Sequence, residues 1–255
     1  MIMNPHISVL VLNWNGIHLL KPCLDSILKM TYPNFSVMVV DNGSNDGSNK
    51  MVKEDYPMVQ LLSLEKNYGY AGGYNKCFKH LKQDPPEYLV LLNNDTEVDS
   101  RLLDEFIQAT EEFGKDNIYG AKIFYFHERD RIWYAGGVVK LAFGLIYHKG
   151  IRQFDASAFS KPIKTDYVTG CCLFTSWKTI YQMNGFDEGF KQIYCEDVDL
   201  CLRAKKEDIN CYFWPGAKLW HHISAAMGGN FGPRKLIRKY SALSRLWIKH
   251  YLQFG

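Results

Sequence analysis

The sequence lacks the patterns that would place it among membrane, secreted or low-complexity proteins. Its 255 residues contain no apolar run of about 18 residues, the length that a membrane-spanning helix requires. The first six residues lack a charged stretch followed by an apolar one, as a signal peptide would have. An apolar content of 47% is enough for a substantial core. We therefore expect a globular protein of the cytoplasm.

Neither the cysteines nor the net charge indicates a special class of protein. The seven cysteines form no CxxC pair, and Cys171 and Cys172 are adjacent. This spacing predicts neither a disulfide framework nor a zinc site, and it favours a reducing compartment. The net charge of only +3 does not indicate a nucleic-acid-binding protein.

Acidic residues are also absent from the last part of the chain, residues 223–255. The basic residues of this part are Arg234, Lys235, Arg238, Lys239, Arg245 and Lys249. A basic amphipathic helix can lie peripherally on an anionic membrane surface. It can equally be a solvated helix that covers the core, and the sequence leaves both interpretations open.

The part that is rich in signal is the first half, where apolar runs alternate with amphipathic segments. Strands are predicted over 7–12, 35–40, 59–64 and 88–92, and helices over 19–28, 71–81 and 102–113. Continuous apolar runs are typical of strands that are buried on both faces. The alternation predicts a mostly parallel sheet with helices on both faces.

The second half is less regular. Strands are predicted over 121–126, 133–139 and 167–176, helices over 196–206 and 235–251, and a loop over 147–164. A soft boundary near Ile118 separates two halves that share one core. We expect a single domain over 1–255, with halves 1–117 and 118–232 and a C-terminal basic helix over 233–255.

Polar residues stand where three predicted strands end, at Asn13, at Asp41 and at the run Asn93-Asn94-Asp95. Open α/β sheets bind ligands at the carboxyl ends of their strands. Carboxylate and amide oxygens suit Mg²⁺ or Mn²⁺ that holds a diphosphate. Asp41 alone is also consistent with an Asx-turn. Together the strand ends predict chemistry on a nucleotide-activated substrate.

Three carboxylates lie in the first turn of the helix that is predicted to start at Glu196. At about 100° per residue, Val198 faces the core, Glu196 lies opposite, and Asp197 lies between them. A carboxylate at the rim of a cleft can serve as a general base. Acidic residues also favour a first helical turn for electrostatic reasons, and Asp199 is spaced for an ion pair with Arg203.

Two further segments are weaker signals. The glycine-rich segment Asn67–Asn75 opens a predicted helix, as phosphate-binding loops do, but it matches neither a P-loop nor a dinucleotide fingerprint. His221 and His222 follow a predicted strand. A histidine there can bind a metal or a phosphate, although such a pair is more often structural.

Together these segments resemble glycosyltransferase family 2, the inverting enzymes of the GT-A fold, over nearly the whole chain. The matching segments are Val9–Gly16, Val39–Ser48, Asn67–Gly73, Leu91–Thr96, Gly170–Phe174, Gly185–Phe190 and Glu196–Arg203. The Asn93–Thr96 segment and the Glu196–Arg203 block are most similar to the rhamnosyltransferase-like branch. Asn93 replaces the first Asp of the family's Asp-x-Asp motif, which reduces the protein charge at the metal.

The resemblance implies a Rossmann-like, mostly parallel sheet with helices on both faces and a smaller mixed region on the acceptor side. It implies transfer of a sugar from a UDP- or dTDP-linked donor to a glycan or lipid-linked acceptor, with Mg²⁺ or Mn²⁺. Asp197 would be the catalytic base with Glu196 in support, and Asp95 and His221 would bind the metal. The donor pocket would be formed by Leu12, Asn13, Asn15, Asp41, Asn67, Gly72, Asn75, Asn93 and Asn94.

Two other classes of function remain alternatives. A sugar-nucleotide nucleotidyltransferase shares a similar nucleotide half, but it usually carries a glycine-rich, arginine-containing loop where this chain has Asn13-Trp14-Asn15-Gly16. A non-catalytic carbohydrate-binding relative would not need the carboxylates at Asp95 and Asp197. The sequence therefore favours the transferase.

Overall fold

The computed structural model describes residues 4–190, 194–223 and 233–252. The elements of the first half are β1 Ile7–Asn13, α1 Ile17–Ile27, β2 Phe35–Asp41, α2 Ser48–Asp55, β3 Gln60–Ser63, α3 Gly69–Leu81, β4 Tyr88–Asn93, β5 Thr96–Val98 and α4 Leu102–Phe113. Those of the second half are β6 Ile118–Tyr125, β7 Ile132–Tyr134, β8 Gly137–Lys140, η1 Leu141–Phe143, β9 Leu145–His148, η2 Ser157–Phe159, β10 Ile163–Thr165, β11 Cys172–Ser176, α5 Trp177–Gln182, α6 Glu196–Lys206, β12 Cys211–His221 and α7 Pro233–His250.

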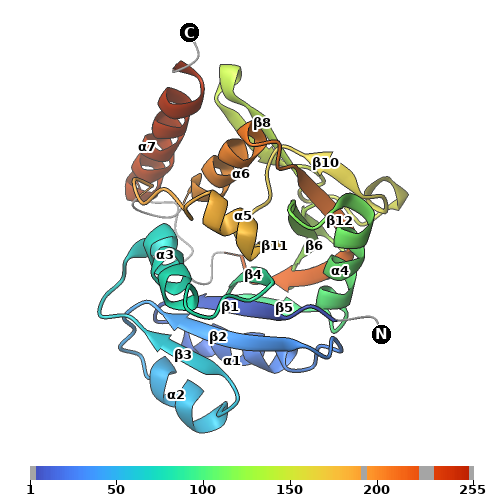
Figure 1. Ribbon diagram of the computed structural model, residues 1–255. Coiled ribbons are helices and arrows are strands. Elements are labelled where there is room, and N and C mark those ends of the chain that lie inside the picture. Colours follow the sequence, from blue (N-terminus) through green and yellow to red (C-terminus); the bar gives the residue numbers. More distant parts are fainter. Residues whose placement is uncertain (1–3, 191–193, 224–232, 253–255) are drawn as a thin grey trace.

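A ten-stranded sheet in the order β10-β12-β6-β11-β4-β1-β2-β3 forms the centre of the described structure, with β5 beside β12 and β7 beside β6. Helices cover both faces of this sheet (Figure 1). The hairpin of β8 and β9 is a separate two-stranded sheet. This is the α/β architecture that the sequence predicts.

The first half of the chain forms a parallel part of the sheet, as expected. β1 lies between β2 and β4 and is parallel to both, and β3 is parallel to β2. In this register Asn13 is opposite Asp41, and Leu12 is opposite Asn93. The polar residues that end these strands therefore meet at one edge of the sheet.

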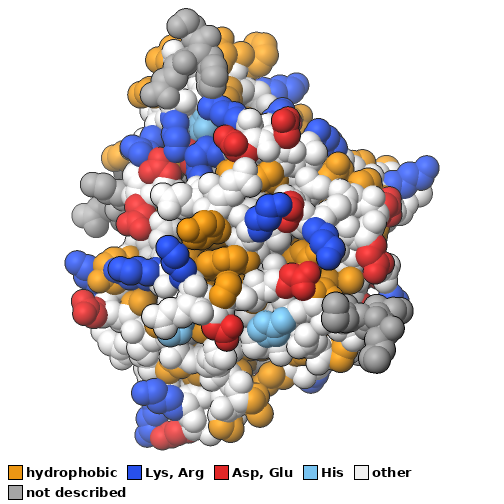
Figure 2. Space-filling view, in the orientation of Figure 1, with side chains coloured by type: hydrophobic (Ala, Val, Ile, Leu, Met, Phe, Trp, Pro, Cys, Tyr) orange, Lys and Arg blue, Asp and Glu red, His pale blue; other side chains and the backbone are white. Residues whose placement is uncertain are grey.

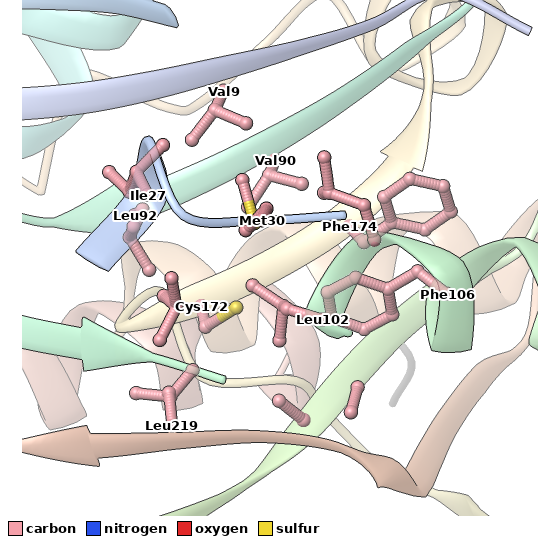
Figure 3. Packing of buried hydrophobic residues seen from close by; sticks show 14 of the residues in the cluster. Val9, Ile27, Met30, Val90, Leu92, Leu102, Phe106, Cys172, Phe174 and Leu219 are labelled. Atoms are coloured by element: carbon pink, nitrogen blue, oxygen red, sulfur yellow. The ribbon is translucent and has the colours of Figure 1, made fainter. Parts of the chain in front are cut away.

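Side chains of the parallel strands alternate between the two faces of the sheet. Val9 and Val11 of β1 lie in a buried cluster with α1, α2 and α4, whereas Leu10 lies in a second cluster with α3, α5 and α6. Figure 3 shows part of the first cluster, in which side chains from the strands, α1 and α4 pack together. Burial on both faces explains why these strands are continuous apolar runs.

The second half adds antiparallel strands and differs from the expectation in several places. The strand predicted over 121–126 begins earlier, at Ile118, and the one predicted over 133–139 is divided into β7 and β8. The division falls at Gly136, whose φ of 105° suits glycine alone. The loop predicted over 147–164 contains the end of β9, the whole of η2 and the start of β10.

β12 has an irregularity within its length. It is parallel to β6, and its register shifts between Trp214 and Lys218, a stretch that contains Pro215. An irregularity of this kind can hold a proline within a strand, because proline has no N–H to donate to the ladder. Beyond the shift, β12 pairs with β5, which the sequence did not predict, and His221 is opposite Thr96.

α7 corresponds to the basic helix that was predicted over 235–251, and it packs against the core through Leu246, which is fully buried. Arg245 and Lys249 pair with Asp187 at 3.0 and 2.7 Å. Part of its positive charge is therefore neutralised by the core, as the interpretation of a covering helix requires. Within the described part of the chain, no helix has both the length and the apolar character to cross a membrane.

Candidate active site

Asn13 is the centre of a buried polar network at the carboxyl edge of the parallel strands. Its amide nitrogen donates to Asp41 Oδ1 at 3.0 Å and to Ser48 Oγ at 3.0 Å. Its carbonyl oxygen accepts from Asn94 Nδ2 at 2.7 Å. The structure thus brings together three residues from three strand ends that the sequence predicted to share a site. Because Asn13 is fully buried and its amide is bonded on both sides, it fixes the other two in place.

Asp41 is fully buried and uses both carboxylate oxygens within the protein. Oδ1 accepts from Asn13, and Oδ2 accepts from the Ser44 backbone N–H at 2.9 Å. The second bond forms the Asx-type turn that the sequence left open as an alternative role for Asp41. The turn is tied to Asn15, which has a φ of 48° and accepts from the Asn45 N–H at 2.8 Å. Asp41 therefore shapes the rim of the strand edge.

The glycine-rich segment that opens α3 is held at its start by two asparagines. Asn67 Oδ1 accepts from the Gly69 N–H at 2.7 Å, and the Asn42 side chain donates to Asn67 Oδ1 at 3.1 Å. A Cβ added at Gly72 would lie 2.9 Å from the Cβ of Tyr68, so only glycine fits there without a shift. The amide of Asn75 is engaged elsewhere, with the backbone of Phe186 and with Glu188, at 2.9 to 3.0 Å.

Two other predicted pocket residues lie beside this network. The Leu12 side chain is half-buried, and its Cδ1 would contact a Cβ placed at Gly73. The Asn93 backbone N–H donates to the Cys171 carbonyl at 3.0 Å, and its side chain is half-buried. Both residues border the strand edge without belonging to the buried network.

Asp95 and His221 form the second part of the site. Pairing of β5 with β12 places His221 opposite Thr96. Thr96 follows Asp95 directly in the chain. His221 Nε2 lies 3.1 Å from Asp95 Oδ1, and both side chains are more than nine-tenths buried. The His222 backbone N–H donates to the Asp95 carbonyl at 2.8 Å and closes the turn. The sequence had placed these two residues together only through the family resemblance.

The Asp95–His221 pair fits a divalent cation. Asp95 Oδ1 is buried without a hydrogen-bond partner, although His221 Nε2 is within bonding distance, so the two atoms do not face each other as donor and acceptor. A carboxylate oxygen and an imidazole nitrogen that converge in this way are suitable ligands for Mn²⁺ or Mg²⁺. Among the described residues, no three His, Cys, Asp or Glu side chains are grouped to hold a metal alone. A cation held by Asp95 and His221 would need further ligands, which water or a bound substrate can supply.

Gly170 and Cys171 connect this pair to the acidic start of α6. The Gly170 N–H donates to Asp197 Oδ2 at 2.8 Å, and the Cys171 carbonyl accepts from the Asn93 N–H at 3.0 Å. Burial, and then the charges of Asp95 and other neighbours including Asp197, raise the pKa of the Cys171 thiol well above its usual value. Both carboxylates thus lie close to one cysteine, so they belong to the same region of the structure.

The start of α6 is held in an uncommon backbone conformation. Tyr194 and Cys195 have φ values of 137° and 68°, in the region that favours glycine. The Tyr194 N–H donates to Glu196 Oε2 at 2.7 Å, and Asp197 Oδ1 accepts from the Val198 N–H at 2.8 Å. Strained residues of this kind persist where the surrounding structure requires them, often at functional sites. Here they aim the first turn of α6 at Gly170.

The helical position of Glu196 suggested that it lies on an open side of α6. In the structure it is buried instead. It is 4% exposed, because the backbone of the preceding turn folds over it. Burial, and then the neighbouring Asp197 charge, raise the pKa of the Glu196 carboxyl from 4.5 to about 8. Burial also raises the pKa of Asp197, against the two backbone N–H groups that stabilise its charged form. Asp197 is the more exposed of the two.

Asp199 has a structural role that the sequence showed only in part. The predicted ion pair with Arg203 is confirmed, at 2.8 Å. Asp199 also pairs with Lys249 and His250 of α7, each at 2.7 Å, and it is fully buried. Burial alone would raise the pKa of Asp199, but hydrogen bonds from His250 and Lys249 hold it below the usual value. This carboxylate therefore anchors α7 to α6.

Comparison with known proteins places these observations in a family. The model of "Glycosyl transferase family 2" matches residues 8–177. An uncharacterised protein of Sinorhizobium fredii, y4gI, is 27% identical over 96% of this chain, which spans 28% of that protein. The N-acetylglucosaminyl-diphospho-decaprenol L-rhamnosyltransferase of Mycobacterium tuberculosis is 25% identical over 82% of this chain and 73% of its own length.

The solved structures include one of similar shape. GalNAc-T7, crystallised with UDP, GalNAc and Mn²⁺, superposes with a TM-score of 0.74 at 14% identity, over 96% of this chain and 48% of its own. At this level of identity the likeness concerns the fold. It confirms the architecture that the sequence predicted.

The buried carboxyl of Glu196 yields a prediction about stability. Because its pKa is raised, Glu196 should keep a proton in the folded protein at pH values above 4.5, where the unfolded chain releases it. The free energy of unfolding of the wild type should therefore fall, relative to Glu196→Gln, as the pH rises through this window. Urea denaturation at pH 5 and pH 8 measures the difference. The exposed control Glu111→Gln should show no such pH dependence, and an equal difference for Glu196→Gln at both pH values would contradict the assignment.

Proposed function

We propose, since the chain belongs to glycosyltransferase family 2, that it catalyses inverting, metal-dependent transfer of a sugar from a nucleoside diphosphate to an acceptor hydroxyl. The observation that carries the proposal is that two adjacent residues, Gly170 and Cys171, bind two different parts of the site. One residue binds the carboxylate of Asp197, and the next binds the backbone of Asn93, two residues before Asp95. A base and a metal-binding pair would thus lie close together, as direct displacement at a sugar carbon requires.

The donor nucleotide would lie at the carboxyl edge of β1, β2 and β4. The network of Asn13, Asp41 and Asn94 fixes the floor of this edge, and the turn at Ser44 and Asn15 forms its rim. Because these groups bind one another tightly, they give the nucleoside a preorganised surface. In this proposal the residues contact base and ribose, and the diphosphate reaches toward Asp95.

Asp95 and His221 would hold Mn²⁺ or Mg²⁺ together with the diphosphate. A cation there neutralises the charge that develops on the leaving nucleoside diphosphate. The replacement of the motif's first Asp by Asn93 leaves Asp95 as the single carboxylate of this segment. The donor phosphates are therefore necessary ligands in the proposal, and a UDP- or dTDP-linked sugar would supply them.

Asp197 would act as the general base. Its Oδ1 and Oδ2 each accept one backbone N–H, which fixes the orientation of the carboxylate. The raised pKa of Asp197 makes it a better proton acceptor than an ordinary surface aspartate. It removes the proton from the acceptor hydroxyl as the oxygen attacks the anomeric carbon from the face opposite the diphosphate. Glu196, buried behind it, keeps its orientation.

The names of the relatives also support a proposal about the classes of donor and acceptor. The name of the Mycobacterium tuberculosis protein describes transfer of L-rhamnose to a lipid-linked N-acetylglucosaminyl diphosphate. We extend this to a deoxyhexose or hexose donor and a glycan or lipid-linked acceptor in surface polysaccharide synthesis.

The outward face of α7 supports a peripheral contact with the membrane that would carry such an acceptor. At 100° per residue, five apolar side chains lie on the side opposite Leu246, and they are 45–68% exposed. They are Ile237, Tyr240, Ile248, Tyr251 and Leu252. Figure 2 shows hydrophobic side chains at the upper end of the molecule, where Figure 1 places α7. Amphipathic helices of this kind bind membrane interfaces.

Replacing Asp197 by Asn should lower kcat for sugar transfer by about 10²- to 10⁴-fold, because the amide cannot accept the proton. Asp199→Asn should lower the stability toward urea but leave kcat much closer to the wild-type value. Assays with a panel of nucleotide sugars, Mn²⁺ and lipid-linked acceptors measure kcat for both variants, and urea denaturation measures their stability. Transfer by Asp197→Asn at nearly the wild-type rate would reject the base, and release of pyrophosphate instead of nucleoside diphosphate would favour a nucleotidyltransferase.

Binding to vesicles tests the membrane contact. The double variant Tyr240→Ser, Ile248→Ser should sediment less with vesicles of anionic phospholipid than the wild type does, since two exposed apolar groups are lost. Met58→Ser is the matched control, because Met58 is 65% exposed outside α7. Equal sedimentation of the double variant and the wild type would count against a role for this face.

A further inference from the structure

His221 lacks the hydrogen bond that usually orients a metal-binding histidine. A ligating imidazole normally donates its second N–H to a carboxylate or a carbonyl, and this fixes the ring. In this structure Nδ1 of His221 is buried without a hydrogen-bond partner, while Nε2 points toward Asp95. Some other contact must therefore hold the plane of the ring.

Trp133 supplies that contact. Its ring centroid lies 4.7 Å from that of His221, with the planes at 72°. The ring also lies 4.4 Å from His148 at 81°, so it is fixed between two imidazoles. Edge-to-face arrangements of aromatic rings at this distance stabilise one relative orientation over others. The His221 ring is thus oriented by packing instead of by a hydrogen bond.

A bulge in β7 explains why Trp133 points this way. Ile123 of β6 is opposite Tyr134, whereas Phe124 is opposite Ile132, so Trp133 is an extra residue without a partner on β6. Bulges of this kind turn a side chain away from the regular alternation of a strand, often beside active sites. No sequence pattern signals the bulge, and the family match did not assign a role to this residue.

His148 completes the support from the other side. Its Nδ1 lies 3.1 Å from the Trp133 carbonyl oxygen, and the ring also contacts Tyr134 at 5.1 Å. Burial lowers the pKa of His148 to about 4, so the ring is uncharged at neutral pH and can donate from Nδ1. The backbone and the ring of Trp133 are therefore both restrained.

We infer that Trp133 is a positioning residue for the metal site, which holds the imidazole of His221 in the orientation that binds a divalent cation. This inference rests on the proposed metal role of Asp95 and His221. It assigns to an aromatic contact the function that a hydrogen-bonding carboxylate or carbonyl has in most metal sites.

The test is calorimetric titration of Mn²⁺ into the full chain with UDP present, so that the donor phosphates are available. Trp133→Leu removes the aromatic edge, and Mn²⁺ should bind about 10- to 100-fold more weakly, the usual cost of losing such support. Trp133→Phe keeps an aromatic ring and should restore most of the affinity. Circular dichroism shows whether the leucine variant folds. If it does not fold, Trp133→Met is a milder second variant.

Tryptophan fluorescence gives an independent readout. Bound Mn²⁺ is paramagnetic and should quench Trp133 strongly, because the indole lies against a proposed ligand. Trp133→Phe should lose the quenching that depends on Mn²⁺ and UDP. Trp177→Phe is the matched control, since Trp177 packs on Tyr181 in α5, and it should retain that quenching.

Wild-type Mn²⁺ affinity in the folded leucine or methionine variant would overturn the inference, and so would unchanged quenching in Trp133→Phe. These outcomes are separate from failure of the proposed function. A wild type that binds Mn²⁺ with UDP but transfers no sugar rejects the function and leaves the positioning role of Trp133 intact.

Discussion

The pairing of β5 with the end of β12 is the constraint on which the site depends. Without it, Asp95 would end a strand in the first half of the chain, and His221 would end another in the second half. Three residue pairs of this ladder run from Val98 with Leu219 to Thr96 with His221. They bring His221 Nε2 to 3.1 Å from Asp95 Oδ1. β12 stays paired with β6 on both sides of its register shift near Pro215, so β5 pairs with the other edge of the same strand. The closeness of Asp95 and His221, on which the proposed cation site rests, is thus a product of sheet topology.

A second constraint joins the metal pair to the base through the backbone. Gly170 and Cys171 are neighbours in the chain, and each bonds to a different part of the site. Peptide geometry limits the distance between adjacent residues, so the two parts cannot move far apart. On the other side, Asp199 and Asp187 bind α7, and the helix that carries Asp197 is held from behind. The position of the proposed base and the docking of the last helix therefore depend on the same ion pairs.

Sequence reasoning recovered what local patterns encode. Buried runs such as Ile7–Leu12 identify parallel strands, and polar residues at their ends, including Asn13 and Asp41, identify the binding edge. It did not find β5, the bulge at Trp133 or the burial of Glu196. Each of these depends on contacts between distant segments, such as Thr96 with His221, for which no local period exists. The position of His221 after a predicted strand left both a structural and a ligand-binding role open, and only the family resemblance assigned it to the metal.

The central claim is that Asp95 and His221 form an incomplete cation site that the donor diphosphate completes. Calorimetric titration of Mn²⁺ into the wild-type protein, with and without UDP, tests it most directly. The account predicts weak binding to the free protein and much tighter binding with UDP, and predicts that His221→Ala loses the gain. Tight binding without UDP, or a gain that survives in His221→Ala, would contradict it.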